Sequence, residues 1–234
     1  TGADIKTAVI TLEGLGVDGI GMNCGLGPDQ MLELLKEMQK YSSTPIFIQP
    51  NAGLPVSVNG KTTYNVTAEE FARKQLSILH NGACALGGCC GTTPDHIRAM
   101  IDLCKNEKIA EIDKKSYTAV SSYSKAVIFN EKPVIIGERI NPTGKKLLKE
   151  ALRNNDMDYI YREGVAQADA GADILDVNVG LPEIDEPTMM VNAVKGLQSI
   201  LDTPLQIDTS DTEAMEKALR IYNGKPMINS VNGK

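Results

Sequence analysis

The stretch DGIGMNCGLGPDQMLELLKEMQKYSSTPIFIQ, residues 18–49, predicts one strand–helix–strand unit. Short β-rich runs open and close it, at 18–23 and 45–49. Between them, apolar side chains recur at the i, i+3, i+4, i+7 spacing of an amphipathic helix: Met31, Leu34, Leu35 and Met38. Two parallel strands need a crossover of this length. The stretch therefore predicts a parallel α/β architecture.

The same alternation continues along the chain. Further β-rich runs lie at 83–87, 133–137, 173–178, 204–208 and 226–230. A second apolar stripe at helical spacing consists of Ile97, Met100, Ile101 and Cys104. Helix starts are indicated by two capping boxes and by a proline at a first helical position: Thr67 with Glu70, Ser210 with Glu213, and Pro94 after Thr93. Gly82 and Gly171 stand where helices end in a left-handed residue.

The segment 105–132 interrupts this pattern, because it is polar, rich in Ser and Lys, and without a clear helical stripe. It is long for a connection inside a compact domain. We therefore predict one domain at 1–106, a linker at 107–132 and a second domain at 133–234. About three strands precede the linker and four follow it, so the expected fold is parts of two (β/α)8 TIM-type barrels. A single barrel of seven or eight strands with an irregular excursion remains the alternative.

Composition narrows the class of protein. Hydrophobic residues make up 42% of the chain and charged residues 23%, as in ordinary globular proteins. The net charge of −6, without a basic run, argues against a nucleic-acid surface, and no apolar run reaches the roughly 20 residues that span a bilayer. Five cysteines, two of them adjacent, favour reduced thiols or metal ligands over disulfides, so we expect a cytoplasmic location.

Three cysteines follow predicted strands. Cys24 comes after the run 18–23, and Cys89 and Cys90 come after the run 83–87. In parallel α/β folds the chemistry lies at these carboxyl ends, so the three thiols can converge. Nearby glycines allow a close backbone approach: Gly25, Gly87, Gly88 and Gly91. Three thiolates with an open fourth position suit a catalytic zinc ion, while buried structural cysteines are the alternative. Cys84 and Cys104 are expected in the core.

The segments GMNCGLGP (21–28) and GGCCGTTPDHI (87–97) resemble the two zinc-ligand segments of the homocysteine S-methyltransferase family. The resemblance implies that Cys24, Cys89 and Cys90 bind Zn²⁺ and act in catalysis, with the sulfur of homocysteine at the open position. A zinc ion lowers the pKa of a bound thiol and favours the nucleophilic thiolate. His80 and His96 are expected to be helix-surface or packing residues, not ligands.

The second half places acidic and amide side chains where strands end. They occur in GERINPTGKK (137–146), DILDVNVG (173–180), QIDTSD (206–211) and INSVNGK (228–234). The candidates are Glu138, Asn141, Asp176, Asn178, Asp208 and Asn229. Asp176 and Asn178 share a strand parity, so both can point into one barrel interior. Such a ring suits a flat heteroaromatic ligand. The alternative is that these residues only form turns and helix caps, as expected for Asp185 and Asp211.

These segments resemble the methyltransferase branch of the pterin-binding family. The resemblance implies that Glu138, Asp208 and Asn229 contact the pterin of methyltetrahydrofolate, with Asn141, Asp176 and Asn178 as further contacts. The amide of Asn229 is expected to hydrogen-bond N5 and so to assist catalysis.

Together the two resemblances imply methyl transfer from 5-methyltetrahydrofolate to homocysteine via cobalamin, giving methionine and tetrahydrofolate. Cobalamin would be carried by a partner module outside this chain; no nucleic-acid or membrane partner is expected. The chain alone is expected to be inactive, because neither barrel is complete. Two alternatives remain: a non-catalytic zinc-binding fragment, and a pterin-dependent corrinoid methyltransferase with structural cysteines.

Overall fold

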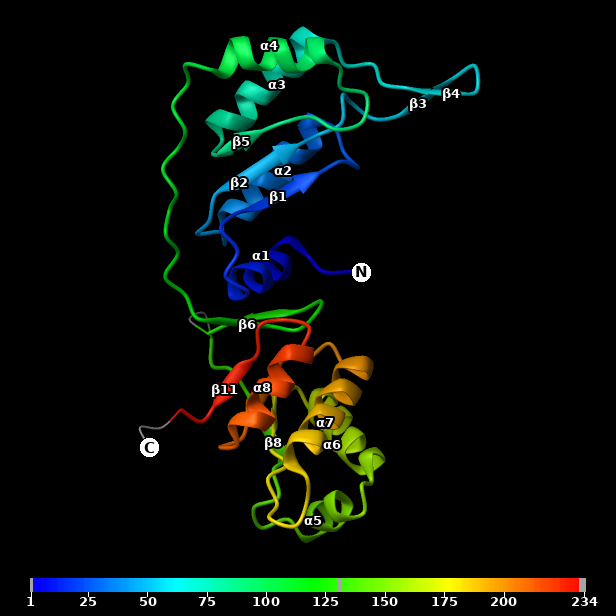
Figure 1. The fold of residues 1–234 in the computed structure, drawn as a ribbon, viewed down its shortest axis with the longest axis vertical. Coiled ribbons are helices and arrows are strands. Elements are labelled where there is room, and N and C mark those ends of the chain that lie inside the picture. Colours follow the sequence, from blue (N-terminus) through cyan, green and yellow to red (C-terminus); the bar gives the residue numbers. More distant parts are fainter. Residues whose placement is uncertain (1, 130–131, 232–234) are drawn as a thin grey trace. The chain divides into compact units, whose positions relative to one another are not determined.

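The computed structural model describes residues 2–129 and 132–231. Residues 130–131 of the predicted linker and residues 232–234 of the segment INSVNGK lie outside the described part. The chain divides into two compact units (Figure 1). One is Leu15–Ser116, here called the three-stranded unit. The other joins the N-terminal residues through Gly14 to the residues from Tyr117 onward and is called the four-stranded unit.

The three-stranded unit contains a parallel sheet in the order β1-β2-β5. Its elements are β1 (Ile20–Asn23), α2 (Pro28–Gln39), β2 (Ile46–Gln49), β3 (Val56–Val58), β4 (Lys61–Thr63), α3 (Ala68–His80), β5 (Ala85–Leu86) and α4 (Pro94–Cys104). The strand–helix–strand unit predicted at 18–49 is thereby confirmed. The antiparallel hairpin β3–β4 extends away from the sheet (Figure 1).

The predicted helical stripes differ in how well they are covered. In α2, Met31, Leu35 and Met38 are buried, as the spacing predicts. In α4, Met100 is buried in a cluster with Phe71 of α3, but Ile101 is 51% exposed. The apolar stripe of α4 is therefore wider than the side that α3 covers.

Most of the predicted helix ends are confirmed. Thr67 caps α3 by accepting a hydrogen bond from Glu70 N at 3.3 Å, and Pro94 is the first residue of α4. Gly82 and Gly171 have φ values of +97° and +94°. The capping box predicted at Ser210 is wrong, because Asp211 directly precedes α8 (Thr212–Ile221) and accepts from its first backbone N–H groups.

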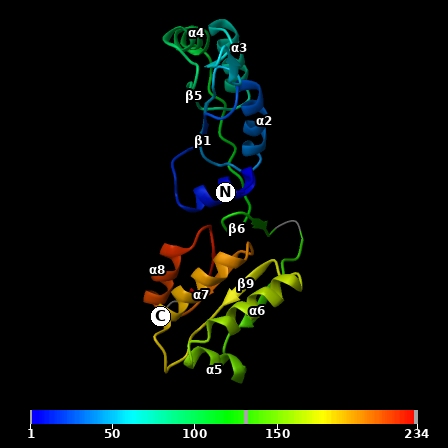
Figure 2. The ribbon, with the colours of Figure 1, turned by 90° about the vertical axis from the view of Figure 1, so that its right-hand side faces the viewer.

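The four-stranded unit contains a parallel sheet in the order β11-β10-β9-β8. Its elements are α1 (Ile5–Gly14), β6 (Ala119–Ser121), β7 (Ala126–Ile128), β8 (Ile136–Ile140), α5 (Lys146–Arg153), α6 (Met157–Asp169), β9 (Ile174–Val177), α7 (Glu186–Ile200), β10 (Leu205–Asp208), α8 and β11 (Met227–Asn229). Helices α6, α7 and α8 lie next to one another beside β9 (Figure 2). Asp185 caps α7 through Thr188 N, as predicted.

Strand β8 begins later than predicted. The predicted run 133–137 starts on Pro133, which has no backbone N–H to give to a neighbouring strand. Pairing with β9 begins at Ile136 and continues, with a register shift, to Ile140.

The two faces of the four-stranded sheet differ in polarity. Residues of one parity are buried against the helices: Leu175, Val177, Leu205 and Ile207. The register sets Gln206 opposite Asp176 and Asn229 opposite Asp208, so the other parity forms a polar face. The core thus lies between sheet and helices, while polar groups line the face away from the helices.

The structure differs from the predicted linker at 107–132. Within it, β6 and β7 form an antiparallel hairpin. Val120 and Val127 of the hairpin are buried in a cluster with Ile174 of β9, and Ala119 packs against Ile10 of α1. The hairpin therefore belongs to the four-stranded unit and packs on its own sheet. Strands of three residues are too short to produce a readable alternation in sequence.

Tyr222 connects this hairpin to the sheet through two hydrogen bonds. Its buried hydroxyl accepts from Leu205 N at 3.0 Å and donates to Ser121 O at 2.9 Å. We expect Tyr222→Phe to lower the free energy of unfolding by about 1–2 kcal/mol, because the buried Leu205 N–H loses its acceptor, whereas Ser121 O still accepts from Lys225 N. Urea denaturation measures this, with Tyr123→Phe in the exposed hairpin turn as control. Equal stabilities of Tyr222→Phe and the unmodified chain would contradict the prediction.

The described residues thus form an α/β structure with three parallel strands in one unit and four in the other, consistent with TIM-type enzyme domains. Among the helices of residues 2–129 and 132–231, none has the length and apolarity needed to cross a membrane.

Candidate functional site

Two loops that carry thiols are anchored to the end of β2. Cys24 follows β1 with a left-handed φ of +66°, and its N–H donates to Gln49 O at 3.0 Å. Cys89 follows β5, and its N–H donates to Pro50 O at 2.8 Å. Because β2 lies between β1 and β5, these bonds bring both loops over its carboxyl end.

The three predicted thiols lie together. The Sγ atoms of Cys24 and Cys90 are 3.5 Å apart, those of Cys89 and Cys90 are 4.0 Å apart, and all three fall within 4.8 Å of one another. Thiolates that bind one tetrahedral zinc ion at about 2.3 Å are about 3.8 Å apart. The spacing therefore fits a zinc ion. Cys90 is exposed and the other two are half-buried, so the group opens to solvent.

Cys24 and Cys89 differ in their electrostatic environment. The pKa of Cys24 is lowered, first because the backbone N–H of Gly25 donates to its sulfur and then because the two neighbouring thiols do. The pKa of Cys89 is raised, first because its thiol donates to Cys24 and then by burial. Cys24 is therefore the group among the two that ionises more readily.

Asn51 joins the two thiol loops, although the sequence analysis did not select it. Its side chain is only 3% exposed, and its Oδ1 accepts from Cys90 N at 3.0 Å. Its own N–H donates to Leu26 O at 2.9 Å, two residues beyond Cys24. Asn51 comes just after the strand predicted at 45–49, and this strand lies in sequence between the two strands that Cys24 and Cys89 follow. That position could have indicated a role in the site.

Tyr64 lies against Gly91. Gly91 has a φ of +79°, and a Cβ added there would come within 2.3 Å of Tyr64 Cγ. The pKa of the Tyr64 hydroxyl is raised, first by burial and then by Cys90. The glycine after the cysteine pair thus allows an aromatic ring to pack beside the thiols, which the sequence did not predict.

The other cysteines and His80 lie outside the thiol group. Cys84 and Cys104 are half-buried, not fully in the core as predicted, and burial raises the pKa of Cys104. His80 is exposed and its Nε2 lies 2.8 Å from Glu107 Oε2, consistent with the predicted helix-surface position.

The polar face of the four-stranded sheet contains two hydrogen-bonded pairs. Asn178 Nδ2 donates to Asp208 Oδ2 at 2.9 Å, and Gln206 Nε2 donates to Asp176 Oδ1. Asn229 lies in register beside Asp208 on the next strand. Asp176 on β9, Asn178 just after it, Asp208 on β10 and Asn229 on β11 are thereby brought to neighbouring positions.

Glu138 and Asn141 form a separate pair at the end of β8. Asn141 Nδ2 donates to Glu138 Oε1 at 3.1 Å, and Asn141 Oδ1 accepts from Thr143 N at 3.0 Å. Asn141 is buried, whereas Glu138 is exposed. Besides burial, the charge of Glu138 raises the pKa of Asp176 and the side-chain amide of Asn141 lowers it, so this pair is connected with the polar face.

Asp176 is a buried carboxyl group that lacks part of its hydrogen bonding. It is 2% exposed, and its Oδ2 has no hydrogen-bond partner among the described residues. Burial raises its pKa to about 6, although the hydrogen bond from Gln206 acts in the opposite direction. Gln206 was not among the predicted site residues, although it shares a strand parity with Asp208.

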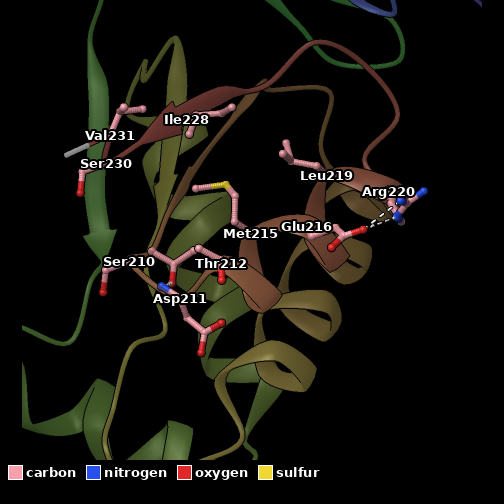
Figure 3. A pocket seen from close by; sticks show the side chains of 11 residues that line it. Ser210, Asp211, Thr212, Met215, Glu216, Leu219, Arg220, Ile228, Ser230 and Val231 are labelled. Carbon is pink, nitrogen blue, oxygen red and sulfur yellow. Dashed lines mark hydrogen bonds and ion pairs between the residues drawn. The ribbon is translucent and has the colours of Figure 1, made fainter. Parts of the chain in front are cut away.

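A groove of about 650 Å³ lies elsewhere in this unit, between α8 and β11. In Figure 3, Met215 and Ile228 face each other across it, and none of the polar-face candidates lines it. Ile228 has the parity opposite to Asn229, so the groove lies on the helix side of the sheet.

Comparison with known sequences divides the chain in two. Residues 1–104 match the family model described as homocysteine S-methyltransferase, and residues 137–234 match the one described as pterin binding enzyme. The first part of the chain therefore contains a homocysteine S-methyltransferase domain sequence, and the second part contains a pterin-binding enzyme domain sequence. The resemblance inferred from the sequence is confirmed.

The particular relatives are methionine synthases. The chain is 33% identical to those of Mycobacterium leprae and Mycobacterium tuberculosis over 99% of its own length. It spans 20% of the length of each. A solved structure, the carboxyl transferase domain of Rhizobium etli pyruvate carboxylase with pyruvate, aligns with 89% of this chain and 32% of its own at 15% identity, and its TM-score of 0.28 is too low to support an argument.

Proposed function

We propose that this chain belongs to an enzyme that transfers the methyl group of 5-methyltetrahydrofolate to homocysteine, with cobalamin, bound by a module outside this chain, as the carrier. The three-stranded unit would bind homocysteine and the four-stranded unit the folate, each as part of a (β/α)8 barrel. The observation that carries the proposal is the convergence of three sulfur atoms within 4.8 Å, in the segment that matches homocysteine S-methyltransferases.

The thiol group suits a zinc ion held by Cys24, Cys89 and Cys90. Zinc supplies Lewis acidity, which favours the thiolate form of a thiol substrate at neutral pH. The chain's residues would hold the site in shape: Asn51 spaces the two loops, and Tyr64 covers one side of the cysteine pair. The exposed position of Cys90 leaves a path by which homocysteine can reach the metal.

The polar face suits the pterin ring. The unpartnered Oδ2 of Asp176 is an acceptor that lacks a donor, and a pterin carries ring N–H and amino donors. Asp208 and Glu138 would add carboxylate acceptors, while Asn141 and Asn178 orient them through their side-chain amides. We assign to Asn229 the hydrogen bond to N5, which would make the amine a better leaving group when the methyl group departs.

Titration of methyltetrahydrofolate into the intact protein tests the folate site. We expect Asp208→Ala and Asn229→Ala each to weaken binding about tenfold or more, because an unpaired polar group costs about 1–3 kcal/mol. Asp202→Ala, in the exposed turn before β10, is the control and should bind as the unmodified protein does. Unchanged affinity in both site variants would remove these residues from the folate site.

A further inference from the structure

The imidazole of His96 makes hydrogen bonds through both nitrogens. Nε2 lies 3.0 Å from Val66 O, while Nδ1 lies 3.3 Å from Thr93 N and 2.8 Å from Thr93 Oγ1. A carbonyl oxygen only accepts, so Nε2 carries the hydrogen and donates. In a neutral ring Nδ1 is then the acceptor for the two Thr93 groups, and one tautomer satisfies all three contacts.

The Val66 side of this ring leads to Cys90. Val66 N donates to Ala52 O at 3.2 Å, and Ala52 N donates to Cys90 O at 2.9 Å. The backbone of the second zinc-site cysteine is therefore connected to the imidazole through two residues of the segment between β2 and α3.

The Thr93 side leads back to Cys89. Thr92, which precedes Thr93, donates to Cys89 O from its backbone N–H at 3.1 Å and from its hydroxyl at 2.6 Å. The two routes start from adjacent cysteines and meet at one imidazole. The hydrogen bonds thus form a continuous network that connects both ends of the loop carrying Cys89 and Cys90 to His96.

The ring is also fixed by packing. It stands edge-on against Phe71 of α3, with the ring centroids 5.6 Å apart and an interplanar angle of 79°. Phe71 is fully buried. The position of the imidazole is therefore set by the contact between α3 and α4, the largest helix–helix contact of the unit.

We infer that His96 is a positioning residue, which holds Cys89 and Cys90 at the spacing that a metal ion requires. This inference rests on the proposed zinc site. His96 is not a metal ligand, because both of its ring nitrogens already make hydrogen bonds to other residues of the protein. At the third helical position a Glu or Gln usually completes the cap. Here the imidazole of His96 completes the cap. Its Nε2–H also donates to Val66 O, and this hydrogen bond connects the end of the 51–66 segment to the loop that carries Cys89 and Cys90.

Two variants of His96 distinguish the effect of its hydrogen bond to Val66 O from the effect of its helix cap. His96→Glu keeps an acceptor for Thr93 N but has no donor for Val66 O, whereas His96→Gln offers both. We expect zinc affinity, measured by competition with a chromophoric chelator, to fall about ten- to a hundredfold in His96→Glu. His96→Gln should recover most of the loss. His80→Gln, on the exposed end of α3, should bind zinc as the unmodified protein does.

Two further measurements identify a positioning role. Substitution with Co²⁺ reports the thiolate geometry, and its sulfur-to-cobalt absorption should shift in His96→Glu and not in His80→Gln. The melting temperature of the metal-free protein should be similar in His96→Glu and His96→Gln, because both retain the cap.

If His96→Glu binds zinc as tightly as the unmodified protein, the positioning role of His96 is overturned, while the proposed function is unaffected. Equal losses in both His96 variants, with equally lowered melting temperatures, would also overturn it in favour of a purely structural role. Absence of zinc binding in the unmodified protein would overturn the proposed function and this inference with it.

Discussion

Replacing Cys90 with serine should lower the zinc affinity of the protein by about a thousandfold, since one of three thiolates contributes roughly a third of a binding free energy of about 10–16 kcal/mol. A serine hydroxyl does not ionise near neutral pH and is a poorer ligand for zinc than a thiolate. Cys89→Ser should have a similar effect, because the two sulfur atoms lie only 4.0 Å apart in the same group. Chelator competition at constant pH measures both.

Cys84→Ser provides the matched control. Cys84 is a half-buried free thiol that precedes β5, and it lies outside the group formed by the three zinc candidates. It should leave the zinc affinity unchanged. Full affinity in Cys90→Ser, or an equal loss in Cys84→Ser, would refute the zinc assignment.

Asp176→Asn should stabilise the protein above pH 6 and leave it unchanged near pH 4. The pKa of Asp176 is about 6 in the folded chain, against an ordinary value of 3.8 for an aspartate side chain. The folded state therefore holds the proton more tightly, and its stability falls as the pH rises from about 4 to about 6. The difference of roughly 2 pKa units corresponds to at most about 3 kcal/mol at pH 7. An asparagine carries no charge, and its oxygen can still accept from Gln206.

Urea denaturation of the ligand-free protein across this pH range measures the effect. The stability difference between Asp176→Asn and the unmodified protein should be near zero at pH 4 and reach its maximum above pH 6. Asp202→Asn, an exposed carboxyl group, should show no such change. A stability difference that is the same at every pH would contradict the burial argument.

The proposed role of Asp176 in folate binding would account for a buried carboxyl group that destabilises the fold when it is charged. Its Oδ2 has no hydrogen-bond partner in the described part of the chain, and a buried acceptor without a donor destabilises the fold. Binding sites often carry such a cost in stability. A ligand that donates to Oδ2 would supply the missing hydrogen bond.

The sequence was sufficient to predict the parallel strands and the cysteine group. Met31, Leu35 and Met38 repeat over about two turns, which indicates a helix, and two strands joined by a helical crossover are expected to be parallel. Parallel strands end at one edge, which is why Cys24 could be assigned to the same place as Cys89 and Cys90. Asp176 and Asn178 were assigned to one face by strand parity, and their side chains are hydrogen-bonded to Gln206 and Asp208, which share a parity on β10.

Other features depend on contacts that no local pattern encodes. The hairpin β6–β7 forms because Val120 and Val127 are buried against Ile174, which lies about fifty positions later in the chain. Tyr64 lies beside the thiols because the β3–β4 hairpin returns the chain toward Gly91. His96 was predicted to be a helix-surface or packing residue, and its hydrogen bond to Val66 O depends on a contact between segments 30 positions apart in the chain.

The position of the thiols over the middle strand has a mechanical consequence. Cys24 and Cys90 are 66 positions apart in sequence, yet their sulfur atoms are 3.5 Å apart, above the end of β2. A metal ion bound to both sulfur atoms would act as a reversible cross-link between the loops that follow β1 and β5, on either side of β2. A permanent cross-link closing a loop of this length stabilises a fold by about 4 kcal/mol. A metal cross-link is lost when the free ion is withdrawn, so the concentration of free zinc would set the stability of this sheet as well as the occupancy of its site.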